Sequence, residues 1–76
     1  MTDEEVTRRV ETALDSNRYL DASRITVTTN DGVVHLEGLV GDSGDLLAAL
    51  RSVNRVVGAR RVVDELDTCE PDGYGQ

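Results

Sequence analysis

The chain has 76 residues and a net charge of −7, and it contains neither Phe nor Trp. A domain this short buries roughly 60% of its unfolded surface, so a core of Val, Leu, Ile and Ala leaves little volume for an enclosed substrate pocket. The acidic balance disfavours nucleic acid and anionic lipid at long range unless a local basic patch reverses it. A single cysteine, Cys69, excludes an internal disulfide and a Cys-based zinc site.

The sequence also bears on cellular location. No apolar run approaches the ~20 residues that span a bilayer. The N-terminal stretch MTDEEVTRRV lacks the basic and apolar regions of a secretory signal. We therefore expect a cytoplasmic protein for the chain as written, or a periplasmic or envelope location if it is a piece of an exported protein.

The first predicted element is a helix that begins at a capping box, from Thr2 to Glu5, and ends at residues 15–17. Tyr19 and Leu20 are then expected to fold back onto the core. The apolar positions of the helix recur at helical spacing and predict one buried stripe, formed by Val6, Val10, Ala13 and Leu14.

Residues 25–40, ITVTTNDGVVHLEGLV, predict a β-hairpin that turns at Asp31 and Gly32. Each run alternates, as expected of a strand with one buried face. Gly38 removes a side chain from the buried face of the second run, which indicates a bulge or a helix lying close against the sheet.

A second helix is predicted after residues 41–45, with Asp42 or Ser43 as its N-cap. Gly58 is expected to end this helix in the left-handed conformation. Residues 61–67 predict a third strand. The remainder predicts a disordered tail, so that residues 1–68 form one domain and residues 69–76 the tail. The second apolar stripe comprises Leu46, Ala49, Leu50, Val53 and Val57.

The predicted order αββαβ indicates an α+β domain. A right-handed crossover places the third strand parallel to the second. Both helices carry a single stripe, so both are expected to cover one face of a three-stranded mixed sheet. The opposite face would then be open to solvent or a partner and would carry Thr26, Thr28, Val33, His35, Leu39, Val63 and Glu65.

The chain resembles a BON domain, the bacterial module named for osmotically induced and nodulation proteins. The resemblance is carried, in order, by residues 13–15, 25–27, 30–40 and 57–66. It implies an αββαβ fold without enzymatic activity, an envelope setting, and contact with phospholipid or a role in assembly. Relatives with additional domains have been linked to cation binding and to channel or secretin assembly. The family's signature positions are structural, so no catalytic residue is carried over, and Gly32, Gly38 and Gly58 are assigned structural roles.

Two surfaces are candidate binding sites. The first is a basic cluster that could bind an anion or a lipid headgroup through guanidinium groups, or could be ordinary surface charge near a helix C-terminus. It comprises Arg51, Arg55, Arg60 and Arg61. The second is a partner face on the open side of the sheet, formed by Val33, His35, Leu39 and Val63.

Two other features of the sequence have structural interpretations. His35 has no nucleophile or metal-ligand companion at suitable spacing, so no catalytic residue, metal or cofactor is expected. Gly41 to Gly44 match the GxxG spacing of KH nucleic-acid clamps, but Asp42 and Asp45 would repel phosphate.

The leading hypothesis is a non-catalytic BON-type binding module that contacts an envelope-associated protein or a phospholipid and takes no small-molecule substrate. Within it, the net charge favours protein over lipid. The alternatives are a KH-like nucleic-acid-binding domain, which the acidic balance disfavours, and a homo-oligomerisation or cation-responsive accessory domain.

Overall fold

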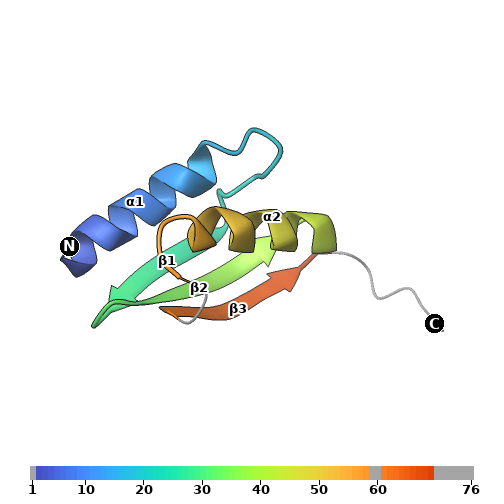
Figure 1. Ribbon diagram of the computed structural model, residues 1–76. Helices are drawn as coiled ribbons and strands as arrows, with labels where there is room; N and C mark the ends of the chain where they lie inside the picture. Colours follow the sequence, from blue (N-terminus) through green and yellow to red (C-terminus); the bar gives the residue numbers. More distant parts are fainter. Residues whose placement is uncertain (1, 59–60, 70–76) are drawn as a thin grey trace.

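Two helices lie on one face of a three-stranded sheet in the computed structural model, which describes residues 2–58 and 61–69 (Figure 1). The elements are α1 (Asp3–Asp15), β1 (Ile25–Asn30), β2 (Val33–Val40), α2 (Ser43–Asn54) and β3 (Val62–Thr68). The strand order is β1-β2-β3, with β1 antiparallel and β3 parallel to β2. The predicted αββαβ order and mixed sheet are confirmed.

The predicted capping box sets the start of α1. The Thr2 hydroxyl accepts a hydrogen bond from the Glu5 backbone N–H at 3.2 Å, and the Glu5 carboxylate accepts one from the Thr2 backbone N–H at 3.2 Å. These bonds satisfy backbone donors that a helix N-terminus otherwise leaves free. Val6, Val10 and Leu14 are buried as expected.

The hairpin turn is held by its own residues and by α1. Asp31 (φ 51°) and Gly32 (φ 80°) are both left-handed, as a two-residue turn between twisted strands requires. The Asp3 carboxylate accepts hydrogen bonds from the backbone N–H groups of Asp31 (2.9 Å) and Gly32 (3.0 Å). The first turn of α1 is therefore attached directly to the tip of the hairpin.

The two remaining glycines behave differently from each other. Gly38 has φ 128°, and a Cβ there would overlap the carbonyl oxygen of Arg24. The close neighbour is thus the backbone leading into β1, not a helix. The prediction for Gly58 is wrong, because α2 ends at Asn54 with a right-handed cap, and Gly58 is not left-handed.

The end of α2 explains that difference. The backbone N–H groups of Val56 and Val57 both bond to the Val53 carbonyl, at 2.9 and 3.0 Å. This turn leaves the helix early and directs both side chains against the core.

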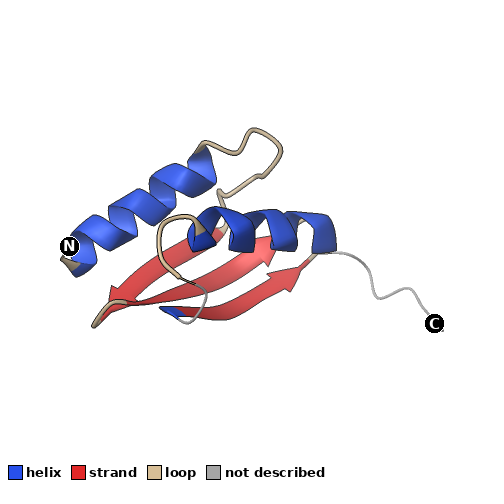
Figure 2. Ribbon diagram, viewed as in Figure 1, coloured by secondary structure: helices blue, strands red, loops and turns tan. Residues whose placement is uncertain are grey.

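The core lies between the helices and the sheet, and no helix or strand of the described residues covers the opposite face of the sheet (Figure 2). Leu20 joins the core, but Tyr19 is 85% exposed, so the expectation that Tyr19 packs inward is wrong. A turn at Asn17 separates the two residues, because Asn17 Oδ1 accepts the Tyr19 N–H and its carbonyl accepts the Leu20 N–H. The buried side chains are Val6, Val10, Leu14, Leu20, Val34, Leu36, Val40, Ala49 and Val53.

Two further expectations concern the ends and location of the chain. The Cys69 backbone N–H donates to the Val40 carbonyl at 2.8 Å, and the rest of the predicted tail lies outside the described residues. Neither α1 nor α2 is long and apolar enough to cross a bilayer, and these are the helices of the part of the chain that is described.

Candidate functional site

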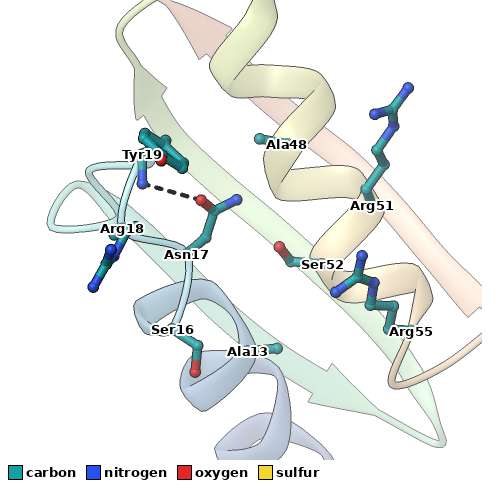
Figure 3. Close-up of a pocket in the computed structure, with 9 residues that line it drawn as sticks. All are labelled: Ala13, Ser16, Asn17, Arg18, Tyr19, Ala48, Arg51, Ser52 and Arg55. Carbon is teal, nitrogen blue, oxygen red and sulfur yellow. Dashed lines mark hydrogen bonds between the residues drawn. The ribbon is translucent and has the colours of Figure 1, made fainter.

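An open groove of about 430 Å³ lies between the end of α1 and the outer side of α2 (Figure 3). One wall comes from α1 and the loop that follows it, and consists of Ala13, Ser16, Asn17, Arg18 and Tyr19. The other wall comes from α2 and consists of Ala48, Arg51, Ser52 and Arg55.

The α2 wall follows from helical spacing. Residues 48, 51, 52 and 55 are three or four positions apart and therefore share one helix face. Ala48 and Ser52 are half-buried, and their small side chains leave space at the base of the groove. Arg51 and Arg55 are exposed.

The α1 wall depends on the turn at Asn17. Its Oδ1 is occupied by the Tyr19 N–H at 3.1 Å, so the amide nitrogen is the end available to a ligand. Figure 3 shows the Asn17 side chain directed toward α2. The Ser16 hydroxyl donates to the Thr12 carbonyl at 2.7 Å and thereby satisfies a backbone acceptor at the C-terminal end of α1.

The groove is positively charged. Arg18, Arg51 and Arg55 line it, and none of them forms an ion pair with a carboxylate among residues 2–58 and 61–69. Arg51 and Arg55 are a like-charge pair at i,i+4, which costs a few tenths of a kcal/mol. The dipole at the C-terminal end of α2 offsets part of this cost. Guanidinium groups bind phosphate and carboxylate oxygens in bidentate fashion, so the groove has the chemistry of an anion site.

The predicted basic cluster is divided by the structure. Arg51 and Arg55 share the groove, whereas Arg61 lines a separate pocket of about 290 Å³ with Gly32 and Val57. Arg60 lies outside the described residues. Arg18 was not predicted as a site residue, because no other arginine lies near it in the sequence. The turn at Asn17 brings Arg18 to the groove.

The predicted partner face is also divided. His35 lies opposite Val63, but Leu39 lies opposite Asp67, and the facing pair Glu37 and Glu65 separates the two positions. The side chains of Leu39 and Val63 are each exposed by 38%. The acidic pair therefore separates Leu39 from Val63 on the open face.

The acidic partner of His35 is Glu65 on the neighbouring strand. The His35 Nδ1 to Glu65 Oε1 distance is 4.0 Å, and the two side chains are 37% and 54% exposed. Within the described ranges, no three His, Cys, Asp or Glu side chains are grouped so as to hold a metal ion.

The Gly41–Gly44 loop caps a helix. Asp42 is the N-cap of α2, and its Oδ1 accepts the Asp45 N–H at 2.8 Å. A carboxylate therefore occupies the position where a phosphate would bind at this helix N-terminus.

The fold and groove together define a small two-layer α+β domain that offers a surface site. Comparison with protein-family models matches residues 2–70 to the BON domain, and the chain belongs to this family. The family is non-catalytic in general, and phospholipid binding or interaction has been suggested as its role. A search of curated proteins found no match.

Proposed function

We propose that the protein is a non-catalytic BON module that binds an anionic group of its partner in the groove lined by Arg18, Arg51 and Arg55. The observation that carries the proposal is the placement of three arginines around one groove with no carboxylate partner among the described residues. Three unneutralised cations on one surface are a cost to the isolated domain that an anionic ligand removes.

A phospholipid headgroup is the first candidate ligand. Its phosphate suits the guanidinium groups, and Ala13 and Ala48 leave room for it in the groove. Tyr19 is 85% exposed at the rim, and a tyrosine ring suits the boundary between water and lipid. A lipid-binding role would place the protein at the bacterial envelope.

An acidic protein segment is the second candidate. The net charge of −7 opposes approach to an extended anionic bilayer more strongly than docking of a short acidic segment. The sequence carries no acid between Leu46 and Val63, so the α2 side remains locally basic for either ligand.

Vesicle flotation tests the lipid assignment. We expect the protein to rise with phosphatidylglycerol vesicles at low salt and not with phosphatidylcholine vesicles. The R51E/R55E variant should bind at least about tenfold more weakly, since each basic residue near an anionic surface contributes about 1 kcal/mol.

The matched control is R8E/R9E, which makes the same charge change on exposed positions of α1 outside the groove. Equal flotation of wild type and R51E/R55E, or none by wild type, rules out lipid at this site. Nuclear magnetic resonance titration with a poly-glutamate peptide then tests the second candidate. The groove residues should shift in the wild type and not in R51E/R55E.

A further inference from the structure

The two edges of the sheet differ in how they are protected. With the order β1-β2-β3, both β1 and β3 present backbone groups on one side that no strand in the described part of the chain satisfies. Such edges pair with other strands unless charges, prolines, bulges or covering elements prevent it.

The edge of β3 is protected. The Asp64 carboxylate accepts the Leu66 backbone N–H at 2.9 Å, which occupies a donor that an added strand would need. Asp64, Glu65 and Asp67 are all exposed along this strand and repel another acidic strand.

Helix α1 packs against β1, where the Thr7 hydroxyl donates to the Thr29 hydroxyl at 2.7 Å, but the edge of this strand carries no charge, proline or bulge. Its sequence, ITVTTN, contains no charge, no proline and no glycine. The Arg24 carbonyl accepts the Leu39 N–H, and bonding residues alternate in an antiparallel ladder, so Thr26 and Thr28 bond toward β2. The backbone groups of Val27 and Thr29 therefore point outward.

On that outer side, one backbone bond is made among the described residues. The Ile25 N–H donates to the Ala22 carbonyl at 3.1 Å. The Ile25 carbonyl and both backbone groups of Val27 and Thr29 remain available on this edge.

We propose that the free edge of β1 pairs antiparallel with β1 of a second copy of this chain, centred on Val27. The Val27 N–H and C=O groups of the two copies exchange hydrogen bonds, and each Thr29 N–H donates to the partner copy's Ile25 carbonyl. Because the Ile25 N–H is occupied, the Thr29 carbonyl of each copy receives no bond in this register, and the pairing consists of these four hydrogen bonds.

The side chains favour a second copy as the occupant. In this register Thr26 of one chain faces Thr28 of the other, and Val27 faces Val27. β-Branched and Thr pairs of this kind stabilise antiparallel sheets, and no like charges meet. A β3–β3 contact would instead bring the acidic residues of that edge together.

The pairing would extend one sheet through both copies about a two-fold axis perpendicular to the sheet. Such an axis keeps both helical layers on the same side. The two arginine grooves would then face the same way, a consequence that rests on the proposed function, whereas the pairing itself does not.

Sedimentation equilibrium from about 10 μM to about 1 mM tests the pairing, a range that covers weak dimers. We expect wild type to form a concentration-dependent dimer and T26K/T28K to associate at least about tenfold more weakly, because lysines then face each other at two places. The control T12K/L47K adds the same charge at exposed helix positions. Both variants lower the net negative charge, so loss of the dimer in T26K/T28K alone is a local effect.

Amide hydrogen exchange locates the contact. In wild type, protection of the Val27 and Thr29 amides should rise with protein concentration, while that of the Thr26 and Thr28 amides, already bonded to β2, stays constant. A wild type that remains monomeric throughout, or a dimer in which the Val27 and Thr29 amides stay unprotected, overturns the proposal. Failure here leaves the vesicle result unaffected, because the groove lies on α1 and α2.

Discussion

At the scale of single residues, Gly38 is the position where the backbone tolerates least change. Its positive φ and its closeness to the Arg24 carbonyl both exclude a side chain. We expect Gly38→Ala to lower the free energy of unfolding by on the order of 3 kcal/mol, measured by urea denaturation.

Gly58 provides the matched control. A Cβ at Gly58 meets no atom of the described residues within 4 Å, and its φ is not positive, so Gly58→Ala should change stability by less than about 1 kcal/mol. Equal destabilisation by the two substitutions would contradict the conformations described for both glycines.

Glu5 makes the stability of the first helix depend on pH. The backbone N–H of Thr2, and then its hydroxyl, hold the pKa of the Glu5 carboxyl below its usual value. The sign follows from the depressed folded-state pKa. The stabilisation is complete above the ordinary glutamate pKa and is lost as the pH falls through the lowered value.

Carbon-detected NMR titration of Glu5 checks this. We expect its pKa to rise toward the ordinary value in Thr2→Ala, because the hydroxyl and the capped geometry are removed. Asp21, whose pKa is lowered by Ser23, should titrate identically in both proteins. An unchanged Glu5 pKa in the variant would show that the capping box does not form in solution.

At the scale of elements, the contact between α1 and the hairpin is specific. Asp3 accepts two backbone N–H bonds from the turn at Asp31 and Gly32. Asp3→Ala removes both acceptors and should destabilise the domain by about 1–2 kcal/mol in urea denaturation.

A substitution at the neighbouring Glu4 distinguishes the effect of this contact from the effect of the helix dipole. Glu4→Ala removes an acid from the same helical turn but is not bonded to the hairpin, so it should cost less than about 0.5–1 kcal/mol. A cost for Asp3→Ala no greater than that for Glu4→Ala would mean that the turn does not depend on α1.

At the scale of the whole molecule, the fold is stabilised by the core between the helices and the sheet. The open face of the sheet contributes little to this stability. Leu36 is fully buried beneath the helices, whereas Leu39 is 38% exposed on the open face. We expect Leu36→Ala to cost about 2–5 kcal/mol. In a domain of this size, that is a large share of the total stability.

Leu39→Ala makes the same chemical change on the open face and should cost less than about 1 kcal/mol. Thermal unfolding followed by circular dichroism compares the two. Similar losses would indicate that the open face is covered in solution, which would in turn point to an interface involving that face.

Periodicity and turn chemistry are local properties, and they allowed most of the architecture to be predicted. The capping box at Thr2, the Asp31–Gly32 turn and the alternation of β2 each depend on residues a few positions apart. The right-handed crossover rule then determined the parallel placement of β3. The failures at Tyr19 and Gly58 both occurred where a single turn reverses which side chain points inward.

The sequence by itself determined the family and the two-layer fold, because these depend on patterns along the chain. Only the tertiary structure decided which charges share a surface. It joined Arg18 to Arg51 and Arg55, moved Arg61 to another pocket and separated Leu39 from Val63. The physical reason is that a binding surface depends on distances between residues remote in the sequence, and these are set by the packing of loops and helices on the sheet.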